Sequence, residues 1–178
     1  MRIIYNDDHS NRGVEGWYEI LESKMVLFIS GTNFRADWFS NLNAFRKYDI
    51  LADCKVHSGY RKYAKWLHCF IIKLAHNNNL KPKDVYIIGT SMGGGIAQIL
   101  GEYNNFNIVN IGGPRTTTRI TNSKDKLFYN KGGLVYNIPC WFKKIKNAVC
   151  LNDQWRPFWK AHGDYDIEEI ICIIKNGN

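Results

Sequence analysis

Apolar and polar residues follow two different patterns along the chain. Short continuous apolar runs at residues 25–29 and 84–88 end at turns that contain glycine, which predicts strands buried on both faces. Between them, from residue 60 to residue 74, apolar side chains recur every three or four positions, the spacing of one helix face. A second helix, rich in small residues, is expected from residue 91 to about 103, and a further buried strand at residues 106–111.

The last third of the chain is less regular. Residues 134–136 predict a fourth strand, and the isoleucines between residues 167 and 174 have helical spacing, although a strand is the alternative there because isoleucine favours sheets. Strands alternating with helices imply right-handed crossovers and a mainly parallel sheet flanked by helices. The sequence therefore predicts an α/β fold, with residues 1–178 forming a single domain.

Composition narrows the class of protein further. Of 178 residues, 45% are hydrophobic and 14% aromatic, which argues against disorder. No apolar run approaches the roughly 20 residues of a membrane-spanning helix, and residues 1–13 lack the apolar core of a signal peptide. We therefore expect a soluble, cytoplasmic protein. Its five cysteines form no C-x-x-C pair, so we expect reduced thiols and no metal site.

The positive charge is concentrated in one stretch. The chain has 24 basic and 16 acidic residues, a net charge of +8. Residues 113–160 contain ten of the basic and only two of the acidic residues, so this stretch carries the whole surplus. A basic stretch favours anionic partners, although a solvated surface is the simpler interpretation. Charge is the only feature that would suggest nucleic acid, and we expect no nucleic-acid partner.

The clearest chemical motif is Gly89-Thr90-Ser91-Met92-Gly93, which matches G-x-S-x-G. It lies between a predicted buried strand and a predicted helix, the setting of a nucleophile elbow. In such a turn the serine adopts a strained backbone conformation, and the flanking glycines let neighbouring backbones approach without a Cβ clash. The helix that follows favours developing negative charge at its N-terminus.

Further blocks in the same order along the chain resemble the class 3 lipase family, the fungal-lipase-like α/β-hydrolases. Together they extend from about residue 25 to residue 165. The resemblance implies a compact α/β-hydrolase fold, and the shortness of the chain leaves room only for a reduced lid. Besides the elbow, the blocks are Phe28-Ile29-Ser30-Gly31-Thr32, Asp37-Trp38-Phe39-Ser40-Asn41-Leu42, Val56-His57-Ser58-Gly59-Tyr60, Gly112-Gly113-Pro114-Arg115 and Ala161-His162-Gly163-Asp164-Tyr165.

The resemblance also implies roles for individual residues. Ser91 would be the nucleophile, and His162 would accept its proton and later deliver it to the leaving group. The backbone N–H groups of Met92 and Thr32 would form the oxyanion hole. His57 is a competing candidate for the base, but at the matching position of the family the histidine is structural.

The third member of the triad departs from the family pattern. The family has an acid in an Asn-Asp-Ile-Val-Pro-like block after the fourth strand, where this chain reads Val135-Tyr136-Asn137-Ile138-Pro139. Asn137 is one candidate for the position, since an asparagine can orient a histidine through its carbonyl oxygen. Asp153 is the alternative acid, and the sequence leaves the two open.

These features predict a serine-dependent carboxylic ester hydrolase, a lipase, esterase or phospholipase that needs no cofactor. Its substrate would be a lipid or small acyl ester. The basic stretch, with aromatic residues interleaved, is expected at the carboxyl ends of the strands, where it would favour transient contact with an anionic membrane surface. The alternative is a catalytically impaired pseudoenzyme of the same fold that acts as a binding module.

Overall fold

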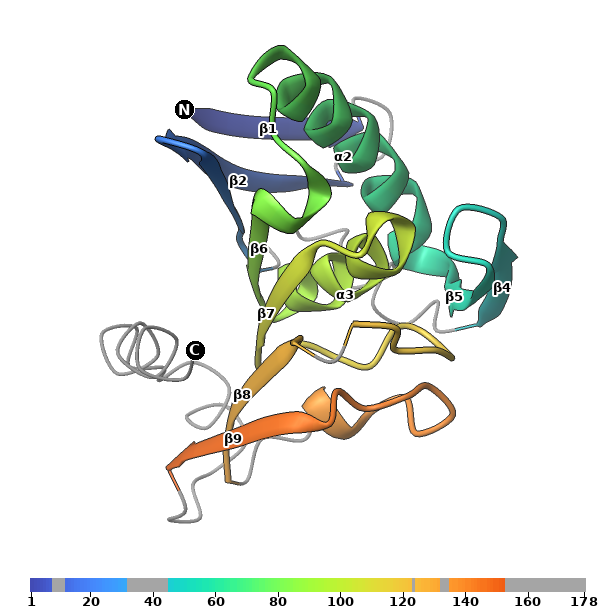
Figure 1. Cartoon of the computed structure of the whole chain (residues 1–178). Coiled ribbons are helices and arrows are strands. Elements are labelled where there is room, and N and C mark those ends of the chain that lie inside the picture. Colours follow the sequence, from blue (N-terminus) through green and yellow to red (C-terminus); the bar gives the residue numbers. More distant parts are fainter. Residues whose placement is uncertain (8–11, 32–44, 123, 132–134, 153–178) are drawn as a thin grey trace.

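The computed structural model describes residues 1–7, 12–31, 45–122, 124–131 and 135–152. The described part is built on a seven-stranded sheet, with a separate two-stranded hairpin and two long helices (Figure 1). The strands are β1 (Arg2–Asp7), β2 (Arg12–Leu21), β3 (Lys24–Ile29), β4 (Arg46–Asp49), β5 (Cys54–His57), β6 (Val85–Thr90), β7 (Asn107–Ile111), β8 (Lys126–Asn130) and β9 (Asn147–Asn152). The helices are α2 (Ser58–Asn77) and α3 (Met92–Asn104), and two short 3-10 turns are η1 (Pro82–Asp84) and η2 (Val135–Asn137).

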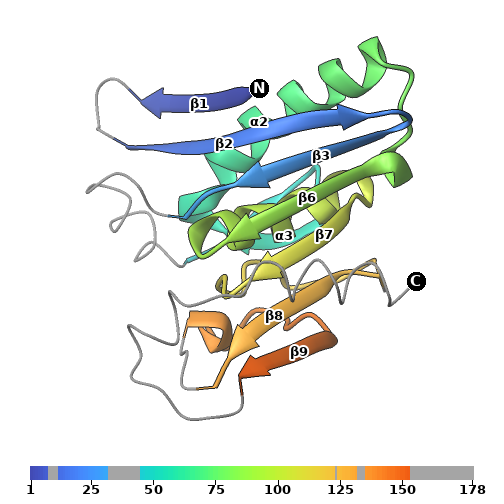
Figure 2. The same cartoon turned by 90° about the vertical axis from the view of Figure 1, so that its left-hand side faces the viewer.

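The large sheet is mainly parallel, as predicted. Its strand order is β1-β2-β3-β6-β7-β8-β9, in which β3 to β9 pair in parallel and β1 to β3 pair antiparallel. Because the pairs from β3 to β9 are parallel, their carboxyl ends share one edge of the sheet and their amino ends the other (Figure 2). The helices α2 and α3 cover the same face of this sheet (Figures 1 and 2).

The predicted strands at residues 25–29, 84–88 and 106–111 correspond to β3, β6 and β7, and both predicted helices are confirmed as α2 and α3. The fourth predicted strand is wrong. Its described residues form the 3-10 turn η2, whereas the strand beside β7 is β8. The prediction rested on the β-propensity of valine and tyrosine. Which segment becomes a strand of the sheet depends on pairing and burial, and the buried residues Leu127 and Phe128 meet both conditions. The predicted element at residues 167–174 lies outside the described residues.

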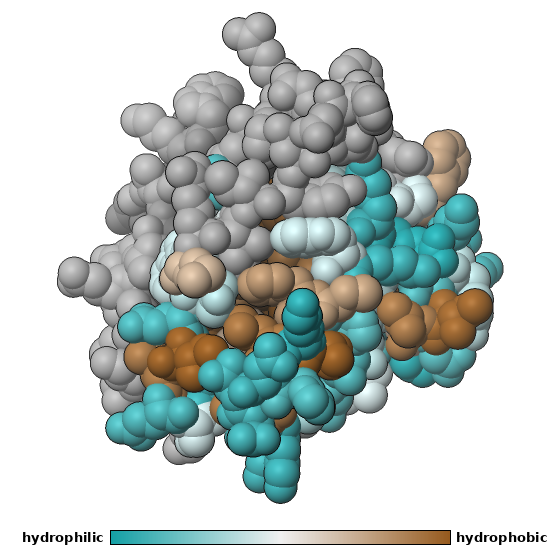
Figure 3. Space-filling model, turned by 90° about the horizontal axis from the view of Figure 1, so that it is seen from above, coloured by the Kyte–Doolittle hydropathy of each residue, from teal (hydrophilic) through white to brown (hydrophobic). Residues whose placement is uncertain are grey.

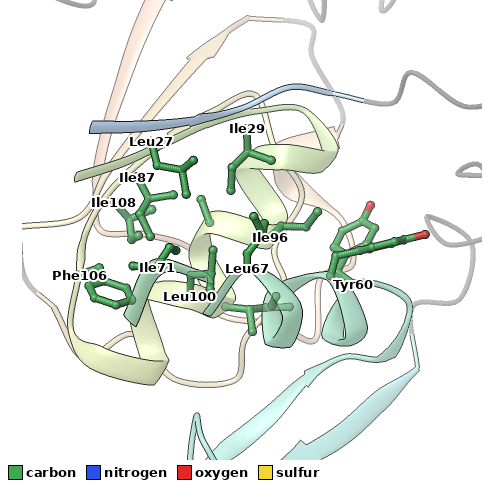
Figure 4. Close-up of a cluster of buried hydrophobic side chains, with 14 of the residues drawn as sticks. Leu27, Ile29, Tyr60, Leu67, Ile71, Ile87, Ile96, Leu100, Phe106 and Ile108 are labelled. Atoms are coloured by element: carbon green, nitrogen blue, oxygen red, sulfur yellow. The ribbon is translucent and has the colours of Figure 1, made fainter. Parts of the chain in front are cut away.

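Helix α3 lies at the centre of the described core. Every residue from Met92 to Glu102 is buried, because the helix packs against the sheet on one side and against α2 on the other. Apolar side chains of the strands meet those of both helices in this layer (Figure 4). Burying each such side chain stabilises the fold by roughly 1.5–3 kcal/mol. The side chains labelled there are Leu27, Ile29, Tyr60, Leu67, Ile71, Ile87, Ile96, Leu100, Phe106 and Ile108.

The β4–β5 hairpin is fastened to α2 by a buried ion pair. The Asp49 carboxylate is fully buried and accepts a hydrogen bond of 2.5 Å from Nε of Arg61. Burial alone would raise the pKa of Asp49, but the hydrogen bond from Arg61 and two backbone N–H groups lower it below its usual value. The hairpin therefore has a fixed position beside the amino end of α2. Within the described residues, no helix is long and apolar enough to cross a membrane.

Candidate active site

Ser91 occupies a strained turn between β6 and α3. Its φ is 50° and its ψ is −120°, a combination that costs a non-glycine residue of order 1–3 kcal/mol. The backbone around it is tied down on the side of the sheet, since the Ser91 N–H donates to the carbonyl of Ile111 at 2.9 Å. The serine hydroxyl is therefore carried on a rigid turn at the carboxyl end of a central strand.

The two glycines of the motif are required by close backbone contacts. A Cβ on Gly93 would lie 2.3 Å from the carbonyl oxygen of Ile29 and 2.5 Å from that of Ser30. A Cβ on Gly89 would lie 2.2 Å from the carbonyl oxygen of Gly93. All three distances are shorter than real Cβ atoms tolerate, so any side chain would push α3 away from β3 and β6. The motif therefore needs glycine at these two positions because α3 approaches the sheet so closely.

The end of β3 lies directly beside Ser91. A Cβ on Gly31 would be 3.2 Å from Cβ of Ser91 and 3.8 Å from its Oγ. Ser30 fixes this strand end, because both its N–H and its hydroxyl donate to the Glu15 carbonyl at 2.8 Å. Thr32, the predicted oxyanion residue, follows Gly31 in the chain but lies outside the described residues.

Met92 is the first residue of α3 and is 1% exposed. The Gly95 N–H donates to the Ser91 carbonyl at 3.2 Å, which starts the hydrogen bonding of the helix. The N–H groups of Met92, Gly93 and Gly94 precede that bond, so they have no acceptor within the helix. Together with the helix dipole, these donors favour negative charge next to the Ser91 side chain.

Asn110, a buried polar residue that the sequence analysis did not single out, also stabilises this turn. Asn110 is 2% exposed, and its Oδ1 accepts the Gly113 N–H at 2.8 Å. Gly113 in turn packs against the elbow, since a Cβ there would be 2.6 Å from the Ser91 carbonyl oxygen. An asparagine inside an otherwise apolar strand is the signal that could have indicated this role, because a buried amide needs hydrogen-bond partners.

Asn137 lies in η2 and is bonded to Arg115. Its Oδ1 accepts a hydrogen bond of 3.0 Å from Nη2 of Arg115, and the Arg115 N–H donates to the Ile138 carbonyl at 3.0 Å. These two bonds attach the segment after β8 to the Gly113–Arg115 turn, which itself touches Ser91. The amide oxygen that a triad asparagine would use therefore already carries a cationic donor.

Comparison with known proteins adds the fold relationship. No family model matches the chain, and no curated protein matches it at a significant level. Solved structures do match. A fungal lipase superposes with a TM-score of 0.63 at 14% identity, over 84% of this chain and 62% of that one. Lip2 lipase from Yarrowia lipolytica gives 0.58 at 16% identity, over 76% and 61% of the two chains.

The chain has a fungal-lipase-like α/β-hydrolase fold. A triacylglycerol lipase from Penicillium expansum also superposes, with a TM-score of 0.55 at 12% identity over 80% of this chain and 65% of that one. The chain spans about three-fifths of the length of the lipases it matches.

Within this lipase-like fold, His57 is buried and packed against its neighbours, as expected of a residue with a structural role. It is 1% exposed, its ring stacks on Tyr60 with centroids 4.1 Å apart, and its backbone N–H donates to the Thr116 carbonyl at 2.8 Å. This environment agrees with the structural interpretation made from the sequence. His162 and Asp153, the predicted base and the alternative acid, both lie outside the described residues, as do residues 37–42, one of the blocks that carry the family resemblance.

Among the described residues, part of the basic stretch lies away from the Ser91 edge, where the sequence analysis expected it. Residues 113–122 run beside α3, from Ser91 toward the opposite edge of the sheet. Three hydrogen bonds mark this path. They join Thr116 to Gly95, Arg119 to Glu102, and Asn122 to the Phe106 carbonyl. Lys126 begins β8 and Lys146 directly precedes β9, so both lie at the amino ends of parallel strands. The prediction is wrong for these residues because each parallel crossover must return the chain to the amino edge.

Proposed function

We propose that the chain is a serine-dependent carboxylic ester hydrolase with Ser91 as its nucleophile. The observation that carries the proposal is the backbone of Ser91, a non-glycine residue at φ 50° between a buried parallel strand and a helix. A protein maintains such strain where the exact direction of a side chain matters. The tight approach of Gly31, together with the N–H groups at the start of α3, surrounds the same hydroxyl with backbone.

In the proposed reaction, Oγ of Ser91 attacks the ester carbonyl while His162 accepts the hydroxyl proton. The N–H groups of Met92 and Thr32 stabilise the oxyanion, and losing one such donor typically costs about 10²–10³ in rate. The alcohol leaves with the proton from His162. Water then attacks the acyl–Ser91 ester, again with His162 as the base, and releases the acid. No cofactor enters this sequence.

Asn137 and Asp153 remain the candidates for orienting His162. The Asn137 oxygen has a second acceptor position besides the one that Arg115 occupies. A guanidinium beside it would, however, oppose the positive charge that His162 gains during the reaction. The contact between Arg115 and Asn137 therefore favours Asp153 as the acid. Asn137 would then help to hold the Gly113–Arg115 turn in place.

The proposed substrate is a lipid or small acyl ester, the class that the triacylglycerol lipase among the structural neighbours suggests. Transient contact with an anionic membrane is supported by the β4–β5 hairpin. Phe45 and Ile50, which flank β4, are 79% and 81% exposed, and β4 begins with the basic residues Arg46 and Lys47. Exposed apolar side chains beside cations suit the surface of an anionic bilayer. On the face of the molecule seen in Figure 3, the coloured hydrophobic side chains form several small groups separated by hydrophilic ones.

Covalent labelling tests the nucleophile directly. Incubation with a fluorophosphonate should form one Ser91 Oγ–phosphorus bond with release of fluoride, seen as a single adduct by intact-mass spectrometry and mapped to the Ser91 peptide. The matched control is Ser58→Ala, at the start of α2, which should label like the wild type. Absence of an adduct on folded protein would reject the hydrolase and favour the alternative, a binding module of the same fold.

A further inference from the structure

A cavity lies at the edge of the sheet opposite Ser91. Its volume is about 480 Å³, and its walls are formed by residues 118–122 and Asp125, which precede β8, and by residues 143–147, which lead into β9. Figure 1 shows these segments, in yellow and orange, side by side on the helix-bearing face of the sheet. The bond from the Lys143 N–H to the Thr117 carbonyl, 2.7 Å long, joins them.

The walls of this cavity carry an excess of positive charge. Lys143, Lys144 and Lys146 all line it. Within the described part of the chain, neither Lys143 nor Lys146 has an ion-pair partner, and Lys144 lies over the Tyr129 ring, with Nζ 5.1 Å from its centroid. Arg119 also lines the cavity but is neutralised, because Glu102 and Asp53 bind it at 3.3 Å and 3.1 Å.

Among the described residues of the lining, one side chain is acidic, and it does not offset this charge. Asp125 is 2% exposed and bonds to the Ile108 N–H at 3.3 Å. Burial in this apolar surrounding raises the pKa of Asp125 to about 8. At neutral pH the carboxyl group is therefore mostly protonated, so it does not repel an anion, and it can donate a hydrogen bond.

We propose that this cavity binds an organic phosphate, with the phosphoryl group held by Lys143 and Lys146. Its volume falls in the range of small-molecule sites and exceeds what a bare ion needs. Ile120 and Ile145 supply apolar wall for the organic part of the ligand. Lysines suit phosphate because each is a compact point charge with three donors. A free phosphate ester and the headgroup of a phosphatidic lipid share this chemistry.

The site is tested by calorimetric titration of the whole chain with glycerol 3-phosphate at low salt. Saturable binding with a Kd below about 1 mM is expected. The double variant Lys143→Gln/Lys146→Gln should weaken it by about tenfold or more. The matched control, Lys73→Gln/Lys83→Gln, removes two exposed lysines outside the lining and should bind like the wild type. Ester hydrolysis by the cavity variant should stay within about twofold of wild type, which separates this site from the Ser91 proposal.

The source of the phosphate is distinguished by vesicle sedimentation. Phosphatidylcholine vesicles containing about 20 mol % phosphatidic acid should retain the wild type but not the cavity variant if the ligand is a headgroup. Titration without vesicle retention identifies a free phosphate ester. The proposal is overturned if neither probe binds up to about 5 mM, or if the control lysine variant loses as much affinity as the cavity variant.

Discussion

At the carboxyl edge of the parallel sheet, Ser91 is enclosed by backbone, whereas the cavity at the amino edge is lined by side chains. Gly93 packs so closely on β3 that a Cβ would lie 2.3 Å from a carbonyl oxygen. The cavity, by contrast, is lined by the exposed residues Lys143 and Lys146, which belong to an irregular segment. The first site therefore depends on the path of the chain and the second on side-chain charge, so the two sites should respond differently to substitution.

The largest expected effect is at Ser91 itself. Ser91→Ala removes the proposed nucleophile without adding bulk, so hydrolysis of a short p-nitrophenyl ester should fall by about 10⁴-fold or more. The thermal midpoint should change little, because the alanine occupies the same backbone conformation. Steady-state kinetics and circular dichroism on the same preparation check both points. Turnover close to wild type in Ser91→Ala would remove this serine from the mechanism.

Substitution of the elbow glycines sharpens the contrast between backbone and side-chain sites. Gly93→Ala brings a methyl group within 2.5 Å of two carbonyl oxygens, and we expect it to cost about 3 kcal/mol of unfolding free energy or to prevent folding. Gly31→Ala is the matched control, since its Cβ would lie 3.2 Å from Cβ of Ser91 and meets no backbone atom closer than 3.6 Å.

Chemical denaturation of the two glycine variants should therefore separate stability from activity. Gly31→Ala should unfold within about 1 kcal/mol of wild type while losing ester hydrolysis, because the methyl group crowds the Ser91 side chain. Equal stability of Gly93→Ala and wild type would mean that the helix does not approach the sheet as closely as described.

At the amino edge, the buried carboxyl of Asp125 predicts a pH dependence of stability. Its pKa is about 8 in the folded protein and near 4 when unfolded. The folded state therefore holds a proton that the unfolded state has lost, so this group's contribution to stability is complete below about pH 4 and is lost as the pH rises toward 8. Asp125→Asn has no such loss and should exceed wild type by about 1–3 kcal/mol near pH 8, and by less near pH 5.

Urea denaturation at the two pH values measures this difference. Asp84→Asn is the matched control, since Asp84 lies in η1 and is partly exposed. It should show no comparable gain as the pH rises. If the difference in unfolding free energy between Asp125→Asn and wild type were the same at pH 5 and pH 8, Asp125 would not be a buried carboxyl group without a cationic partner.

The same contrast explains which parts could be predicted from the sequence. The elbow is local: Gly89, Ser91 and Gly93 lie within five residues, and the strand and helix on either side have strong apolar patterns. The strand β8 was missed because Lys126 and Asn130 flank only a short apolar centre, and its place is set by pairing with β7 and β9. The cavity was also missed, because two segments that are separate in the sequence meet only once the parallel crossovers are formed.

The smallest expected effect is that of Asn137→Asp, which bears on the two candidates for orienting His162. Asn137→Asp places a carboxylate against Arg115, whose Nη2 is 3.0 Å from the present amide oxygen, so the new charge is neutralised locally and kcat/KM should change by only about threefold. If Asp153 is the acid, Asp153→Asn should reduce kcat by about 10⁴-fold while the protein stays folded. A mild Asp153→Asn together with a strongly impaired Asn137→Ala would assign the role to Asn137, and the Arg115 contact would then be part of the triad.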